Sequence, residues 1–245
     1  MRIIGSGFLA RNLAGLAGGH DDTVVYAAGP SGGAATDLTG FDRDGDRLSA
    51  VVRDCLADNR RLVYLSTSSV GLYGRQGAPL REDGPAFPCS AYGRHKLAME
   101  AVVRAAGVEH VILRLSYPVG AHQPPHQIVP ALTAQLRTGA VTVWRGARRD
   151  LFDVLALVPI IDTLLTDGVT GEIVNVASGY GIPVEAIVDH LATRLGVEPV
   201  RTFRELPAED EIAVDKLHAL VPDVKEFGPD HFRGVLDRYV PEAVR

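Results

Sequence analysis

The sequence has few cysteines and no long run of apolar residues. Its two cysteines, Cys55 and Cys89, lie far apart and show no CxxC spacing, which excludes a disulfide framework and a cysteine metal site. No apolar stretch is long enough to cross a bilayer, and the N-terminal segment reaches glycine after two isoleucines, too soon for a secretory leader. We therefore expect a cytoplasmic protein.

Clusters of basic residues and of metal ligands are also lacking. The formal net charge is -5 and its charged residues are spread along the chain, so a nucleic-acid partner is not expected. His122 and His126 are four positions apart, but Pro124 and Pro125 prevent the helix that would point both rings at one ion. We predict no metal.

What the sequence does contain is an alternation of strand-like and helix-like segments over 245 residues, 46% of them hydrophobic. Short apolar runs predict buried strands, and apolar residues at helical spacing predict helices between them. This alternation is typical of an α/β fold with a doubly wound parallel sheet. The tail from Arg201 reads as short helices in a small lobe. The expected strands lie at residues 2–4, 23–29, 61–66, 110–115, 141–144 and 172–178, and the expected helices at 8–17, 48–56, 91–106, 127–138, 158–165 and 184–195.

A tyrosine and a lysine lie one turn apart at the start of a predicted helix, in "SAYGRHK". Tyr92 is a poor acid or base near neutral pH unless a cation stabilises its phenolate, and Lys96 can supply that cation. The preceding strand runs into Thr67, Ser68 and Ser69, at the sheet edge where doubly wound folds bind ligands. In isolation such a pair is more often a surface contact, so its context decides.

The N-terminal stretch "IIGSGFLARNL" has the form of a nucleotide-binding turn. Gly5, Gly7 and Ala10 occupy the places of a glycine motif, and the following helix could receive a phosphate. Such a turn normally has a ribose-binding acid about 20 residues later. Asp21 and Asp22 precede the strand at 23–29 instead of ending it, so we interpret both as solvated loop residues.

Taken together, these segments resemble the extended short-chain dehydrogenase/reductases, the NAD-dependent epimerase/dehydratase family of nucleotide-sugar enzymes. The matching pieces follow family order: "GSGFLARNL", "TVVYAAG", "YLSTSSVGLYG", "EDGPAFPCSAYGRHKLAMEAVV", "VILRLSYPVG", "RRDLFDV", "GEIVNVASGYGIPVEAIVDHLA" and "VDKLHALV". The resemblance implies a Rossmann-like nucleotide-binding domain at 1–120 and 147–178, a smaller substrate lobe at 121–146 and 179–245, and NAD or NADP as cofactor.

The resemblance also implies residue roles. Tyr92 would be the general acid/base, and Lys96 would lower its pKa and contact the nicotinamide ribose. Thr67 is favoured as the hydroxyl that orients the reacting oxygen, with Ser68 and Ser69 as alternatives. Arg149 would bind the pyrophosphate of the substrate, and Ser116 would also contact the substrate. The remaining cofactor contacts would come from Gly5, Gly7, Phe8, Leu9, Ala27, Ala28 and Gly29.

The chain departs from the family in one large respect. The helix after the glycine turn leads directly into 23–29, which matches the family's fourth strand, so the second and third strands are missing. This predicts a smaller sheet with the first strand at its edge, weakened adenosine binding and weak discrimination between NAD and NADP.

The expected function is hydride transfer at a carbinol or ketone of a nucleotide-linked or activated sugar, as in an epimerase or ketoreductase. Elimination is disfavoured because Ser68 and Ser69 stand where family dehydratases carry an Asp-Glu pair. The alternatives are a cofactor-independent acid/base enzyme and a non-catalytic nucleotide sensor. A homodimer through the helices at 43–58 and 91–106 is implied by analogy. His95 lies within the Tyr-Lys turn and could contact the site, but it is expected to face solvent or a subunit. Trp144 is expected either to contact a base or to pack the small lobe.

Overall fold

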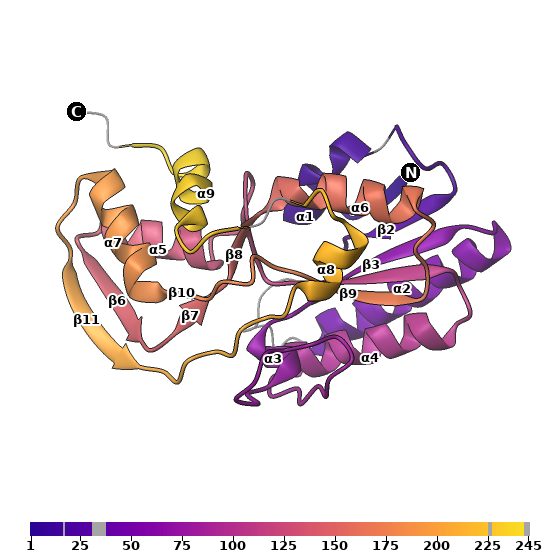
Figure 1. Cartoon of the computed structure of the whole chain (residues 1–245), viewed down its shortest axis with the longest axis horizontal. Helices are drawn as coiled ribbons and strands as arrows, with labels where there is room; N and C mark the ends of the chain where they lie inside the picture. Colours follow the sequence, from indigo (N-terminus) through magenta and orange to yellow (C-terminus); the bar gives the residue numbers. More distant parts are fainter. Residues whose placement is uncertain (17, 31–37, 225–226, 243–245) are drawn as a thin grey trace.

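The computed structural model describes residues 1–16, 18–30, 38–224 and 227–242. Two lobes lie side by side (Figure 1). The larger is built on a five-stranded sheet in the order β1-β2-β3-β4-β9, in which every neighbouring pair is parallel. These strands are β1 (Arg2–Ile4), β2 (Thr23–Tyr26), β3 (Arg61–Thr67), β4 (His110–Leu115) and β9 (Glu172–Val176).

The strand order confirms the predicted doubly wound sheet and its shortened form. Within the described residues β1 has one strand neighbour, β2, with Ile3 opposite Val25. The first strand is thus at the edge, where the missing second strand would otherwise pair.

Helices cover both faces of this sheet (Figure 1). One face packs its apolar side chains against α1 (Phe8–Asn12), η1 (Ala14–Leu16), η2 (Val154–Ala156), α6 (Leu157–Thr166) and α8 (Asp215–Leu220). The other face packs against α2 (Leu38–Ala57) and α4 (Ala91–Ala105). Because both faces are buried, the strands read as continuous apolar runs.

The smaller lobe has a separate core, shared by its helices and its short strand pairs. Strand β6 pairs in parallel with β11, β7 pairs antiparallel with β10, and β5 pairs in parallel with β8. Their bounds are β5 (Tyr117–Val119), α5 (Ile128–Arg137), β6 (Ala140–Arg145), β7 (Arg148–Arg149), β8 (Leu151–Asp153), β10 (Ile182–Pro183), α7 (Val184–Leu195), β11 (Val200–Glu205) and α9 (His231–Tyr239).

Three segments differ from their predicted form. The first helix ends at Asn12 and continues as the 3₁₀ turn η1, so it is shorter than its leucine spacing indicated. The tail contains the strand β11, which is exposed along its length and lacks the apolar alternation that signals a strand. Leu217 of α8 packs into the core of the larger lobe, so the segment 179–245 does not lie wholly in the smaller lobe.

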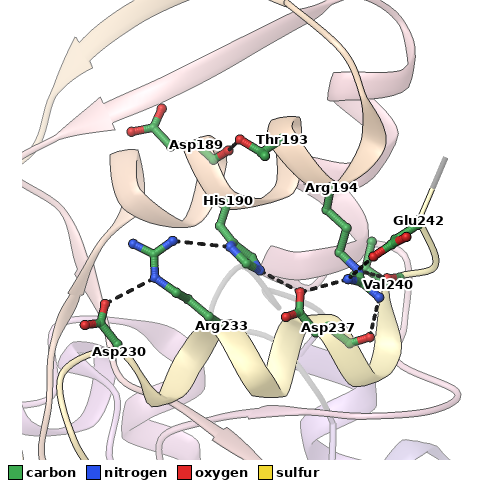
Figure 2. Close-up of polar contacts among 9 residues, drawn as sticks. All are labelled: Asp189, His190, Thr193, Arg194, Asp230, Arg233, Asp237, Val240 and Glu242. Atoms are coloured by element: carbon green, nitrogen blue, oxygen red, sulfur yellow. Dashed lines mark hydrogen bonds and ion pairs between the residues drawn. The ribbon is translucent and has the colours of Figure 1, made fainter.

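A polar network fastens the C-terminal helix α9 to α7 (Figure 2). His190 and Arg194 of α7 contact one carboxylate oxygen of Asp237, at 2.8 and 3.0 Å, and Arg194 also donates to the backbone oxygens of Asp237 and Val240. The guanidinium of Arg233 lies 3.4 Å from the other ring nitrogen of His190. Arg194 therefore satisfies carbonyls at the end of α9 that have no partner inside the helix.

The described part of the chain was found to contain neither a membrane-spanning helix nor a cluster of metal ligands. No helix there is long and apolar enough to cross a membrane. No group of three or more His, Cys, Asp or Glu side chains there is arranged to hold a metal ion.

Candidate active site

A cavity of about 650 Å³ opens at the carboxyl ends of the sheet strands and continues to the smaller lobe. It brings together most of the residues singled out in the sequence. Its walls include Gly7, Phe8, Leu9, Ala27, Gly29, Thr67, Ser69, Tyr92, Lys96, Ser116 and Arg149. Gly5, Ala28 and Ser68 are not among the lining residues.

Helix α4 presents Tyr92 and Lys96 to the cavity. Ser90 caps the helix by accepting a hydrogen bond from the backbone nitrogen of Gly93 at 2.9 Å. Tyr92 and Lys96 then lie four residues apart on the buried face of α4, and both side chains line the cavity.

The Lys96 ammonium is held on the sheet side of the cavity. Its Nζ donates to the Leu65 carbonyl at 2.8 Å and to the Tyr64 hydroxyl at 3.3 Å, and lies 4.9 Å from the centre of the Tyr64 ring. Burial lowers the pKa of Lys96 to about 8, against the opposing effect of the nearby Asp44 and Glu100 carboxylates.

The environment of Tyr92 differs from the one expected. Burial, followed by the charge of Asp44, raises the pKa of Tyr92 above its ordinary value. The lowered pKa predicted from the nearby lysine is not found, and Lys96 directs its hydrogen bonds to Leu65 and Tyr64. The phenol is therefore the stable form of Tyr92 in this arrangement.

The three candidate hydroxyls have distinct surroundings. The Thr67 hydroxyl donates to the Leu115 carbonyl at 3.5 Å and accepts from the Ser69 backbone nitrogen at 3.2 Å. Ser68 is fully buried and lies off the cavity, and its hydroxyl has no hydrogen-bond partner among the described residues. Ser69 lines the cavity, and its buried hydroxyl has no hydrogen-bond partner among the described residues. Ser69 is thus the hydroxyl most available to a ligand.

A close backbone contact sets the distance between Ser69 and Tyr92. Ser69 precedes α3 (Val70–Tyr73), and α3 packs on α4 through Gly71 and Gly93. A Cβ atom on Gly93 would lie 1.7 Å from the Gly71 carbonyl oxygen, which only glycine avoids. This contact accounts for glycine immediately after the tyrosine.

The glycine turn brings the ends of β1 and β2 close together. Gly5 has φ +136, and a Cβ there would lie 2.5 Å from the Ala27 carbonyl, so glycine lets the end of β1 approach the end of β2. Gly7 has open space where a side chain would be. Asp22, at the other end of β2, pairs with Arg61 at 3.0 Å and lies away from the cavity.

Arg149 stands at the smaller-lobe end of the cavity and is paired. Its Nη1 lies 2.6 Å from Glu209, and its guanidinium lies 5.2 Å from the centre of the Tyr117 ring. Ser116 also lines the cavity but donates its hydroxyl to Asp150 at 3.2 Å. Trp144 lines the same end, is 37% exposed, and has the Arg204 guanidinium 5.5 Å from the centre of its ring.

Sequence reasoning missed three site residues. Tyr64 supports Lys96, Glu209 pairs with Arg149, and the Asp44 carboxylate is buried behind the cavity. Asp44 could have been found, because it is a charged residue on the apolar face of α2, three positions after Phe41 and four before Leu48. Glu209 is 60 positions from Arg149, and no local pattern links them.

The parallel sheet, the glycine turn and the Tyr-Lys-hydroxyl cavity at its carboxyl edge together define the doubly wound, nucleotide-binding class of α/β proteins. Residues 16–177 match the model of the NAD dependent epimerase/dehydratase family, and the chain belongs to that family. The resemblance noted in the sequence is thereby confirmed.

Two curated relatives and several solved structures are similar to the chain. It is 35% identical over 211 residues to dTDP-6-deoxy-L-talose 4-dehydrogenase (NAD(P)(+)) of Kitasatospora kifunensis, covering 77% of this chain and 63% of that protein. It is 26% identical over 158 residues to dTDP-D-glucose 4,6-dehydratase of Mus musculus, covering 62% of this chain and 42% of that protein. The chain therefore spans less than two thirds of the length of either relative.

Among solved structures, MoeE5 in complex with UDP-glucose and NAD has a TM-score of 0.76 at 22% identity, covering 89% of this chain and 77% of that one. RMD from Pseudomonas aeruginosa complexed with NADPH has a TM-score of 0.78 at 18% identity and covers 97% of both chains. At these identities the likeness establishes the fold.

Proposed function

We propose that the protein is an NAD(P)-dependent oxidoreductase or epimerase that transfers hydride at a carbinol or ketone carbon of a nucleotide-linked sugar. One observation carries this proposal: a single cavity is lined by Tyr92, Lys96 and Ser69, by the glycine turn and by Arg149. The 35% identity to a dTDP-sugar 4-dehydrogenase supports the same reaction class.

The chain's own residues supply acid/base chemistry and orientation. Tyr92 exchanges a proton with the reacting oxygen of the sugar, and the free hydroxyl of Ser69 orients that oxygen. Lys96 holds a positive charge next to the tyrosine, and Arg149 binds the anionic linker between nucleotide and sugar. The two positions that follow Ser69 are Val70 and Gly71, neither of them an acid that could drive elimination, which favours simple hydride transfer.

The residues present fit a dinucleotide at the glycine turn. The open space at Gly7, the close approach at Gly5 and the cavity walls at Phe8, Ala27 and Gly29 would hold it, with Lys96 at the nicotinamide end. When bound, this cofactor would accept or supply the hydride. Without the strands beyond β1, the adenosine half has fewer protein contacts, so we expect weak preference between NAD and NADP.

The proposal is tested by titrating the purified protein with NAD, NADH, NADP and NADPH. We expect binding of at least one, weakened by Gly7→Val, whose side chain would enter the cavity without meeting a neighbour. Gly15→Val is the matched control, because Gly15 also has open space around it but lies off the cavity. Binding of none of the four would overturn the proposal.

Tyr92→Phe tests the role of Tyr92 in proton transfer separately from cofactor binding. We expect it to bind the dinucleotide as the parent does while turnover of a dTDP-linked 4-keto sugar falls by about 10²- to 10⁴-fold. Unchanged turnover would refute the role of Tyr92.

A homodimer through α2 and α4 is proposed as well. Leu56 of α2 and Val102 of α4 are 48% and 36% exposed, so each helix carries an apolar side chain that a partner could cover. Leu56→Glu is expected to shift the mass measured by light scattering toward the monomer, and a monomeric parent would exclude the dimer.

A further inference from the structure

A buried carboxylate lies behind the lysine of the site, on a helix that the predicted mechanism does not use. Asp44 belongs to α2, and its side chain is 4% exposed. Burying an ionised carboxylate is costly unless it gains hydrogen bonds and a nearby positive charge. The groups around Asp44 therefore indicate what it does.

Two side chains fix the orientation of the Asp44 carboxylate. The Tyr26 hydroxyl donates to Oδ1 at 2.6 Å, and the His95 Nε2 lies 2.7 Å from Oδ2. The ring of Phe41 stacks on His95 with centres 4.6 Å apart. His95 is therefore directed into the protein, and its expected position facing solvent or a subunit is wrong.

The Lys96 ammonium lies close to this carboxylate. Gly29 lies between them: a Cβ built on Gly29 would be 3.0 Å from Lys96 Nζ and 3.5 and 3.6 Å from the two Asp44 oxygens. The ammonium and the carboxylate thus face the same point of the backbone from α4 and α2. Lys96 itself is hydrogen-bonded to uncharged groups, the Leu65 carbonyl and the Tyr64 hydroxyl.

The other nearby carboxylate is already compensated. Glu100, one turn beyond Lys96, accepts hydrogen bonds from Arg114 Nη2 at 2.7 Å and from Arg114 Nε at 3.0 and 3.2 Å, and one from Ser66 at 2.5 Å. Asp44 therefore remains as the buried anion that balances Lys96. The titratable or charged groups around Asp44 are Tyr26 from β2, Arg47 from α2, Tyr64 from β3, and Tyr92, His95 and Lys96 from α4.

We propose that Asp44 is a positioning residue of the active site, whose charge offsets that of Lys96 so that Tyr92 rests as a phenol, ready to donate a proton to a carbonyl substrate. A lone lysine would favour the phenolate, whereas a lysine balanced by a carboxylate does not. In a reduction Tyr92 loses its proton to the substrate oxygen while the carbon gains the hydride, which gives the alcohol and a transient phenolate. The substrate class rests on the proposed function, whereas the protonation of Tyr92 does not.

The test measures the protonation of Tyr92 without cofactor or substrate. Tyrosines are replaced biosynthetically by difluorotyrosine, whose phenol is more acidic, and the Tyr92 signal in fluorine NMR is identified by its loss in Tyr92→Phe. We expect Asp44→Asn, which keeps the size of the side chain, to lower the titration midpoint of Tyr92 by about one pH unit. Circular dichroism checks that the variant is folded.

His95→Gln is the matched control. It retains a hydrogen-bond donor toward Asp44 and leaves the carboxylate charged, so the Tyr92 midpoint should stay at the parent value, and Asp44→Glu should restore it. A midpoint in Asp44→Asn equal to or above that of the parent would overturn the proposal. The absence of any Tyr92 titration in either protein below the pH of unfolding would also overturn it, because Asp44 would then not control the phenol.

The pH dependence of activity provides a second measurement, which would not change if Asp44 had only a structural role. In the reductive direction we expect the alkaline limb of the kcat/KM profile to move to lower pH in Asp44→Asn by the same amount as the NMR midpoint. An unshifted limb with reduced activity would assign Asp44 to stability alone. Failure of dinucleotide binding would overturn the proposed function and leave the NMR result standing.

Discussion

Gly93→Ala is the substitution for which the structure predicts the sharpest effect. The new Cβ would lie 1.7 Å from the Gly71 oxygen, 2.2 Å from its carbonyl carbon and 2.7 Å from the Leu72 nitrogen, all of them backbone atoms. An ordinary contact requires well over 3 Å, so α3 and α4 must separate by more than about 1 Å. No side-chain rotation can relieve this contact.

The expected stability change combines two opposing effects. Alanine in a helix interior gains about 0.5–1 kcal/mol over glycine, while overpacking costs about 1–3 kcal/mol and sometimes more. We expect net destabilisation of about 1–2 kcal/mol, measured by urea unfolding. Because Ser69 lies before α3 and Tyr92 next to Gly93, we also expect turnover to fall by about 10²-fold, the usual effect of a displacement near 1 Å.

The matched control is Gly234→Ala in α9. Gly234 is also a helical glycine, but a Cβ there would have no neighbour within 4 Å. It should gain about 0.5–1 kcal/mol and leave turnover unchanged. If Gly93→Ala matched this control in both stability and turnover, the close contact between α3 and α4 would be refuted.

Three further predictions follow from the site and from the smaller lobe. Ser69→Ala should lower kcat by about 10²-fold. Thr67→Val should have the smaller effect, because the Thr67 hydroxyl already has hydrogen-bond partners. The reverse order in steady-state kinetics would show that Thr67 orients the reacting oxygen. The folded-state pKa of Lys96, about 8, lies below its ordinary value, so the unfolded chain binds more protons above pH 8 and the contribution of Lys96 to stability rises from pH 8 to about pH 10. This rise in the free energy of unfolding should be absent in Lys96→Met, and its persistence there would refute the lowered pKa. Arg194→Ala removes the bonds from α7 to the end of α9 (Figure 2) and should cost about 1–3 kcal/mol in urea unfolding, whereas the more exposed Arg201→Ala should cost less than about 1 kcal/mol.

The edge position of β1 could be predicted from the order of the segments along the chain. Parallel strands must be joined by crossovers. A chain that passes from its first helix directly to the segment matching the family's fourth strand can therefore build only a sheet without the family's second and third strands. The described sheet, β1-β2-β3-β4-β9, has that form. Helix α1 was less predictable, because its leucine spacing fits either a continuous helix or the short helix and 3₁₀ turn that occur.

For the site, sequence identified the residues that are adjacent along the chain and missed those that meet across it. Tyr92 and Lys96 follow from helical spacing, and the hydroxyls follow from the end of β3. Which hydroxyl is free could not be predicted, because that depends on whether the Leu115 carbonyl of the next strand engages Thr67. The lowered pKa expected for Tyr92 was wrong, because burial, followed by the charge of Asp44, raises this pKa.

By itself, the sequence determined the family, the parallel sheet, its missing strands and the Tyr-Lys pair. Each of these depends only on the spacing of nearby residues or on the order of segments along the chain. Tertiary structure alone decided the electrostatics of the pair. Asp44, Tyr26 and Gly29 come from different elements, and the charge that Tyr92 experiences depends on how close folding brings them and on how much water it removes.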